Sequence, residues 1–248
     1  MEQQQAAGNP AMELDQLLMA CLSNNTEAIK AAEASLKRLT ASPALLPELL
    51  ARAAGSPAAE VRQLSAVLLR KAVTKHWTKL SDSDRAHMQS VLLDRLVSEP
   101  AHPVRRSLGH LVGVVARYAV PRGQWPGLLE FLGRCSGSGE AGQREVALGL
   151  LGQLAENLGE HLAPHVSSLQ QLVSAGLRDP APEVVRAAVR VMEPLAGLVA
   201  GGGAAQLEGF HGLVGAVIEV ASRAQSAQPH PDSDTLLSCL QLLVELAE

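Results

Sequence analysis

Apolar residues recur along this chain with the spacing of α-helices. In the segment 60–77, one helical face carries Val61, Leu64, Leu68 and Ala72. Another face of the same segment carries the polar residues Gln63, Arg70 and Thr74. The alternation of apolar and polar residues that marks β-strands is almost absent, and aromatic residues, which strands favour, make up only 2% of the chain. The pattern therefore predicts an all-α protein.

Proline and glycine residues interrupt the helical pattern at regular intervals and divide the chain into six expected helix pairs. We expect the first helices of the pairs near residues 12–22, 43–54, 82–98, 124–136, 162–176 and 204–225. We expect the second helices near residues 26–40, 58–77, 101–119, 140–158, 181–199 and 232–248. The run Ser81-Asp82-Ser83-Asp84 resembles a capping box and predicts that a helix begins there.

An arginine near the start of the second helix repeats along the chain, as Arg62, Arg105, Arg144 and Arg186. The intervals between these arginines are 43, 39 and 42 residues. Two-helix repeats of the HEAT and armadillo types have periods of about 40–47 residues. The spacing therefore predicts a HEAT-repeat, right-handed α-solenoid of about six antiparallel helix pairs. Within the fifth pair, we expect Asp179 to form an ion pair with Arg186 across the turn.

The same proline and glycine residues also divide the chain into larger regions. We expect a disordered tail at residues 1–10, repeats 1–3 at 11–119, repeats 4–5 at 120–200 and a divergent sixth repeat at 201–248. The segment 236–247 is strongly apolar, whereas a terminal repeat normally carries a polar outer face. We therefore expect the sixth repeat to be truncated and the chain to be part of a longer one.

The charge of the chain is unevenly distributed. Residues 1–124 contain 15 Lys and Arg against 11 Asp and Glu, whereas residues 125–248 contain 6 against 14. Neither half is basic enough to predict a nucleic-acid surface, and the acidic half could attract basic proteins. No apolar run reaches the length of about 18 residues that spans a bilayer, so we expect a soluble protein without a membrane partner. The three cysteines are widely separated, which fits a reducing intracellular compartment.

Few residues carry recognisable catalytic chemistry. The run from Gly137 to Gly142 matches G-x-G-x-x-G, but dinucleotide binding needs a strand before it, and a helix is expected there. His161 and His165 have zinc-ligand spacing, but Pro164 lies between them and no third ligand is near. We find no nucleophile motif and no phosphate loop. The sequence therefore predicts no enzyme, no cofactor and no metal site.

A string of basic residues ends the second repeat. It consists of Arg70, Lys71, Lys75, His76 and Lys79. Cations near a helix C-terminus interact favourably with the helix dipole, which would explain the string without a partner. Exposed helical faces of repeat scaffolds are also their binding surfaces. Both explanations stay open on the pattern alone.

Two segments of the first half resemble a known family. The run 34–50 is followed in 60–77 by Val-Arg-Gln-Leu, a small residue, an apolar stretch, Arg70-Lys71 and the closing Trp77. This combination resembles the N-terminal domain of the importin-β (karyopherin-β) family, and the runs 117–129 and 144–148 continue the likeness. The resemblance assigns residues 11–119 to repeats of that N-terminal type, and it implies a nuclear transport receptor.

The resemblance also implies partners. In that family the second helices of the first repeats bind the GTP form of the small GTPase Ran on the concave face. Phenylalanine-glycine nucleoporins bind the outer face, and later repeats hold basic cargo such as histones or ribosomal proteins. The expected locations are the cytoplasm, the nucleus and the nuclear pore, without direct binding of nucleic acid. The candidate Ran-binding residues are Arg62, Gln63, Arg70, Lys71, Thr74 and Lys75. The alternative is a general HEAT-repeat scaffold with another protein client.

Overall fold

The computed structural model describes residues 10–227 and 230–247, and within these ranges all regular secondary structure is helical. The helices of the first half are α1 (Pro10–Cys21), α2 (Thr26–Leu39), α3 (Leu45–Gly55), α4 (Ala59–His76), α5 (Asp82–Ser98) and α6 (His102–Ala119). Those of the second half are α7 (Gly127–Ser136), α8 (Ala141–Leu158), α9 (Val166–Leu177), α10 (Pro182–Val199), α11 (Ala204–Gln225) and α12 (Ser233–Glu245). These form six helix pairs, so the expected all-α HEAT-type fold is confirmed.

The helices begin and end close to the expected positions. The largest difference is at α9, which begins at Val166 rather than near residue 162. Two short 3₁₀ turns, Gly159–His161 and Ala163–His165, precede it. Pro164 lies in the second turn and cannot donate a backbone hydrogen bond. The expected tail at 1–10 lies outside the described residues except for Pro10, which begins α1.

Side-chain caps fix the starts of α2 and α5, among other helices. The Asn25 Oδ1 atom accepts hydrogen bonds from the amides of Glu27 and Ala28, at 3.0 and 3.1 Å, and so begins α2. The Ser81 Oγ atom accepts a hydrogen bond from the Asp84 amide at 3.1 Å, which confirms the expected cap of α5. Each cap satisfies amides that have no partner inside the helix. These starts are therefore determined by local sequence.

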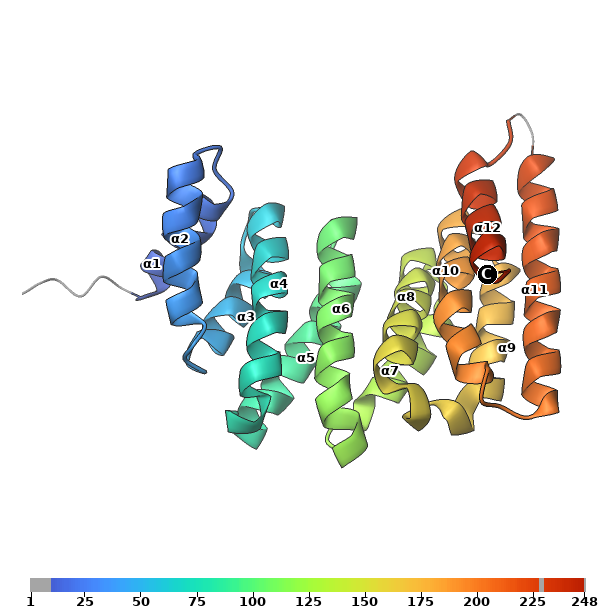
Figure 1. The fold of residues 1–248 in the computed structure, drawn as a ribbon, viewed down its shortest axis with the longest axis horizontal. Helices are drawn as coiled ribbons and strands as arrows, with labels where there is room; N and C mark the ends of the chain where they lie inside the picture. The colour runs from blue at the N-terminus through green and yellow to red at the C-terminus, as the bar shows by residue number, and fades with distance from the viewer. Residues whose placement is uncertain (1–9, 228–229, 248) are drawn as a thin grey trace, which may run out of the picture. The chain divides into compact units, whose positions relative to one another are not determined.

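The chain divides into two compact units, and the boundary along the chain falls within α6, between Val115 and Ala116. In the first unit, α1 packs on α2, and α3 packs on both α4 and α5 (Figure 1). Leucines of the first helices fill its core, among them Leu18 of α1 and Leu49 of α3, together with Leu69 of α4. Trp77, which follows α4, is also buried.

In the second unit, α10 is the central helix and packs against α8, α9 and α12, while α9 also packs against α11. A continuous apolar cluster joins these helices, with Leu151, Val173, Met192 and Val217 among its members. The helices α7, α9 and α11 are the first members of their pairs, and α8, α10 and α12 are the second members (Figure 1). Neighbouring pairs therefore bury one another's apolar faces, as repeat proteins must.

Helix α12 keeps an exposed apolar face. Leu237, Leu240 and Val244 are 56%, 50% and 60% exposed. Leu236 and Leu243, which the sequence places on the same apolar helix, are half-buried instead. Leu243 packs against the apolar cluster of the second unit. The exposed apolar face of α12 therefore contains fewer residues than the apolar sequence of this helix indicates.

Gly176 allows α9 to approach its neighbours closely. A Cβ atom at this position would lie 2.9 Å from the Ala188 Cβ atom and 2.7 Å from the Leu148 Cδ1 atom. The end of the Leu148 side chain can rotate, but the Ala188 Cβ atom is fixed to the backbone of α10. Glycine at position 176 is therefore required by helix packing.

We predict that Gly176→Ala destabilises the second unit by about 1–2 kcal/mol, because overpacking outweighs the higher helix propensity of alanine. Urea unfolding followed by circular dichroism measures the change. Gly149→Ala is the matched control, since Gly149 is exposed inside α8 and a Cβ atom there would contact nothing within 4 Å. The control should raise the free energy of unfolding by about 0.5–1 kcal/mol. Equal effects of the two substitutions would contradict the packing argument.

Candidate binding surface

Arg62 joins two successive repeats at the start of α4. Its Nη1 atom donates to the carbonyl oxygens of Ser56 and Pro57, at 2.8 and 3.1 Å, in the turn of its own repeat. Its Nε and Nη2 atoms donate to the two carboxylate oxygens of Glu99, both at 2.8 Å. Glu99 lies in the turn of the next repeat and is fully buried at its side chain. The planar guanidinium thus makes a bidentate pair that fixes one turn against the next.

Arg144 repeats this arrangement in the second unit. Its Nη1 atom donates to the carbonyl oxygens of Ser138 and Gly139, at 3.0 and 2.9 Å. Its Nε and Nη2 atoms donate to Asp179, at 2.7 and 2.9 Å. The expected pair of Asp179 with Arg186 is therefore wrong. The Asp179 carboxylate instead accepts hydrogen bonds from Arg144 of the preceding repeat and from the Ala181 amide of its own turn.

A third contact of the same kind is looser. The Arg186 Nη1 atom lies 4.0 Å from the nearer carboxylate oxygen of Asp232 and 3.4 Å from the Thr235 hydroxyl. Arg62, Arg105 and Arg144 are the fourth residues of α4, α6 and α8, and Arg186 is the fifth residue of α10, so the expected equivalence of their positions is confirmed to within one residue. We call the contacts of Arg62, Arg144 and Arg186 the arginine ladder.

The three carboxyl groups of the ladder have lowered pKa values. Burial raises the pKa of Glu99, but hydrogen bonds from Arg62, the Ala101 amide and Arg95 outweigh it and lower the pKa from its ordinary 4.5. The hydrogen bonds from Arg144 lower the pKa of Asp179 from 3.8. The hydrogen bonds from Thr235 are the main cause of the lowered pKa of Asp232. Each carboxylate also accepts a backbone amide in its own turn.

Because of this ladder, Arg62 is not part of an accessible binding surface. The residue is 9% exposed and its charge is neutralised by Glu99. Its inclusion among the candidate Ran-binding residues is therefore corrected: the side chain lies between repeats, where it cannot meet a partner protein. The sequence pattern showed the arginine but could not show the buried carboxylate 37 residues away.

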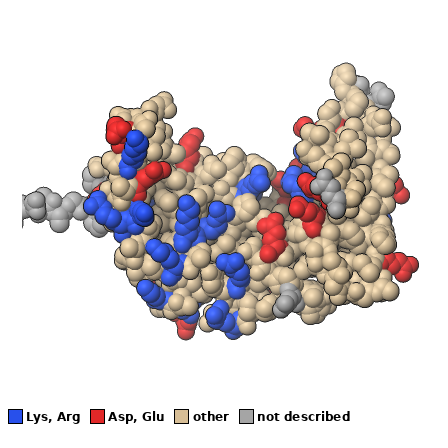
Figure 2. Space-filling model, in the orientation of Figure 1, with Lys and Arg blue, Asp and Glu red and all other residues tan. Residues whose placement is uncertain are grey.

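The other candidate residues lie together on the solvent side of α4. Gln63, Lys71, Thr74 and Lys75 are exposed, and Arg70 is half-buried. We call these five residues the α4 stripe. Among the described residues, Arg70, Lys71 and Lys75 form no ion pair, and the Thr74 hydroxyl donates to the Arg70 carbonyl at 3.1 Å. Figure 2 shows Lys and Arg side chains gathered on this side of the first unit, with few Asp or Glu among them.

The core face of α4 is rotated slightly from the expected one. Val61 and Ala72 are buried as expected, but Leu64 and Leu68 are only half-buried. Ser65 and Leu69 occupy the centre of the interface instead. His76, which the sequence places in the basic string, is also buried, so its imidazole is not part of the exposed stripe.

The remaining candidate motifs have local structural roles. Helix α7 ends directly before the glycine run, and residues 137–140 form the turn between α7 and α8, so the run does not follow a strand. His161 and His165 are exposed, and the described residues contain no group of His, Cys, Asp or Glu that could hold a metal ion. Burial raises the pKa of the thiols of Cys21, Cys135 and Cys239, which disfavours the reactive thiolate. Among the described helices, none combines the length and apolar character that crossing a membrane requires.

Two family models match this chain. One, described as the importin-β N-terminal domain, matches residues 32–98, which include the α4 stripe. The other, described as IPO5-like, TPR repeats, matches residues 100–248 and thus more than half of the chain. The chain belongs to the importin-β family.

Importin-β family proteins from several organisms are similar to the chain. Importin-4 from Mus musculus is 31% identical over 67% of the chain, and Importin-4 from Homo sapiens is 30% identical over 66%. In each case the matched region is 15% of the relative's length. The chain therefore corresponds to a small part of these relatives.

Solved structures of importin-β family members share the fold. A structure of Kap121p is 26% identical, with a TM-score of 0.75, and the match covers 96% of this chain and 22% of Kap121p. A structure of Kap121p bound to Nup53p gives a TM-score of 0.74 at 25% identity, with the same coverage. Importin beta, at 20% identity and a TM-score of 0.75, agrees in fold over 93% of this chain and 28% of its own.

The ladder predicts how the stability of this importin-β family chain depends on pH. The lowered pKa values mean that the folded chain binds fewer protons than the unfolded chain once the pH approaches 4.5 and 3.8. The stabilisation is therefore complete near neutral pH and decreases as the pH falls through the lowered pKa values of the folded state. Thermal unfolding between neutral and acidic pH should show this decrease.

The variant Asp179→Asn should show a weaker dependence on pH, because it removes one of these carboxylates while its amide oxygen can still accept from Ala181. It should also be less stable at neutral pH, because the charge of Arg144 loses its partner. Glu208→Gln, at an exposed position of α11, is the control and should leave the pH profile unchanged. An unaltered profile in Asp179→Asn would show that the ladder does not contribute.

Proposed function

We propose that this chain is the Ran-binding, N-terminal part of a nuclear import receptor. The observation that carries the proposal is the α4 stripe, which lies inside the match to the importin-β N-terminal domain. The stripe presents Arg70, Lys71 and Lys75 without carboxylates that would neutralise them among the described residues. The task of the chain is binding rather than catalysis, since its family consists of transport receptors.

The chemistry of the stripe suits the surface of a folded GTPase. Arg70 offers a planar set of donors for carboxylates or backbone carbonyls, and Lys71 offers a flexible point charge beside it. Gln63 and Thr74 add neutral hydrogen-bonding groups one or two helical turns away along the same face. Discrimination between the GTP and GDP forms would follow if the stripe contacts a surface of Ran whose conformation depends on the nucleotide.

Other transport partners follow from the same proposal. Kap121p has been solved in complexes with Nup53p and with Pho4p. We extend this to nucleoporins with phenylalanine-glycine repeats and to basic cargo such as histones or ribosomal proteins, carried between cytoplasm and nucleus. The acidic second half supports attraction of basic proteins, because Glu156 of α8 and Glu193 of α10 are exposed.

The double variant Arg70→Ala, Lys71→Ala should weaken binding of Ran-GTP by at least about tenfold, because it removes two charges from the centre of the stripe. The measurement is a pull-down and a titration with Ran loaded with a non-hydrolysable GTP analogue, beside Ran-GDP. The wild-type chain should prefer the GTP form.

Lys30→Ala is the matched control, since Lys30 is an exposed cation of α2 that already pairs with Glu27 at 3.3 Å. Its effect on binding should be small. Arg62→Ala should instead reduce the free energy of unfolding, by about 3 kcal/mol, because it leaves the buried Glu99 without its main partner. Equal binding of both nucleotide forms, or of neither by a folded chain, would favour the general HEAT scaffold with another client.

A further inference from the structure

A hydrogen bond joins the C-terminal ends of α2 and α4. The His76 Nε2 atom, in the last turn of α4, lies 3.0 Å from the carbonyl oxygen of Thr40, which caps the end of α2. A carbonyl oxygen only accepts hydrogen bonds, so the Nε2 atom carries the proton. His76 is 4% exposed, and its Nδ1 atom has no hydrogen-bond partner. The imidazole therefore serves to join the two helix ends.

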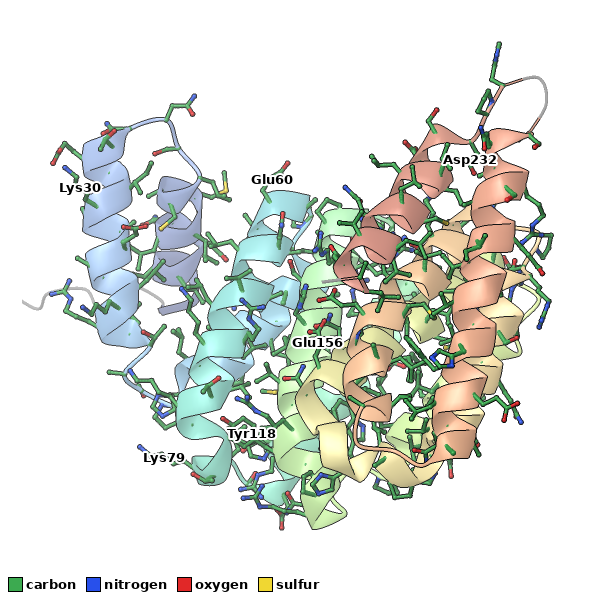
Figure 3. The ribbon with its side chains drawn as sticks, turned by 45° about the vertical axis from the view of Figure 1, so that its right-hand side comes forward. Lys30, Glu60, Lys79, Tyr118, Glu156 and Asp232 are labelled. Carbon is green, nitrogen blue, oxygen red and sulfur yellow. The ribbon has the colours of Figure 1, made fainter. Side chains whose placement is uncertain are left out.

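The two joined helix ends carry cations that lie far apart in the sequence. Lys37 and Arg38 are exposed in the last turn of α2, Lys75 in the last turn of α4, and Lys79 in the 3₁₀ turn Trp77–Lys79 that follows it. We call these four residues the basic end cluster. Figure 3 shows Lys79 at the end of α4 opposite to Glu60, so that this helix is acidic at one end and basic at the other.

Carboxylates do not neutralise the basic end cluster within the described part of the chain. Lys37, Lys75 and Lys79 form no ion pair there, and the Arg38 Nη2 atom donates only to the Ser35 hydroxyl, at 3.0 Å. Glu33 lies one helical turn before Lys37 but does not pair with it. Asp82, at the start of α5, pairs with Arg85 instead, at 2.9 Å. The helix dipole favours cations at the C-terminal end of each helix separately, but it does not explain why two such basic ends are joined to each other.

We propose that the basic end cluster binds an extended, acidic segment of a partner protein. Three of the four cations are lysines, whose long stems and point charges adapt to carboxylates on a flexible chain without fixed geometry. A nucleic acid fits less well, because the chain carries a net charge of −4 and the neighbouring Trp77 ring is buried and so cannot stack on bases. The site goes beyond the proposed Ran surface, since Lys37, Arg38 and Lys79 lie outside the α4 stripe.

The test uses the whole chain and a fluorescein-labelled peptide of alternating glutamate and glycine. The variant Lys37→Glu, Arg38→Glu, Lys79→Glu reverses the cluster but leaves the α4 stripe intact. Because each exposed ion pair contributes little alone, we expect the three reversals together to weaken binding about tenfold by fluorescence anisotropy. Wild-type binding should also weaken as salt is added.

A matched variant separates a local site from the overall charge. Lys30→Glu, Arg122→Glu, Arg134→Glu changes the net charge equally, at exposed residues that do not belong to the basic end cluster. This variant should retain most of the affinity. The proposal would be overturned if both triple variants lost the same peptide affinity, or if the wild-type chain did not bind the peptide at low salt. It would also be overturned if a single-stranded RNA of the same charge bound as tightly as the peptide. Ran-GTP binding, measured in parallel, reports separately on the α4 stripe.

The joint itself can be tested without altering any cation. His76→Leu removes the donor to Thr40, whereas the side-chain amide of His76→Gln can still donate to it. If His76 positions the two helix ends, His76→Leu weakens peptide binding and His76→Gln restores it, with circular dichroism confirming that both variants are folded. Equal affinities of the two folded variants would show that peptide binding does not depend on this joint. Whether the basic end cluster is the binding site is decided separately by the charge-reversal variants.

Discussion

The pairing of an arginine in one repeat with a buried carboxylate in the next is the contact on which this structure depends. A single helix pair cannot bury its apolar face, so its stability comes from its neighbours. Apolar packing alone does not fix the position of one helix pair along the next, because it has little directional character. The bidentate contact of Arg62 with Glu99 has a fixed direction and length, and Arg144 repeats it with Asp179. The ladder therefore sets the register in which the pairs that it joins stack within each unit.

The ladder also determines which face of a helix is available for binding. In α4, Arg62 is turned between repeats, and Gln63 follows it about 100° further around the helix. The residues that share the face of Gln63 are then directed to solvent, and they include Arg70 and Thr74. A structural contact in the first turn thus orients the binding surface over the rest of the helix. This is why a ladder residue and a surface residue can be adjacent in sequence and differ completely in role.

The strength of the ladder varies along the chain. The first two contacts are short and bidentate, whereas Arg186 lies 4.0 Å from Asp232 and reaches Thr235 at 3.4 Å. The looser contact is in the same sixth repeat whose helix α12 exposes Leu237, Leu240 and Val244. The ladder contact of the sixth repeat is therefore weaker than the first two. Two other hydrogen bonds attach this repeat to α9: the Gln170 Nε2 atom donates to the Gln206 carbonyl oxygen at 2.7 Å, and the Arg223 Nη2 atom donates to the Leu177 carbonyl oxygen at 3.0 Å.

The sequence by itself determined the helix pairs, their breakers and caps, the equivalence of the four arginines, and the family. These features are local, because periodicity, capping and proline placement act within a few residues of one another. Only the tertiary structure decided that Asp179 pairs with Arg144 rather than Arg186, and that Arg62 and His76 are buried. It alone placed Thr40, at the end of α2, against His76, at the end of α4. Each of these contacts joins residues at least 35 positions apart, and which of them meet depends on how one helix pair stacks on the next.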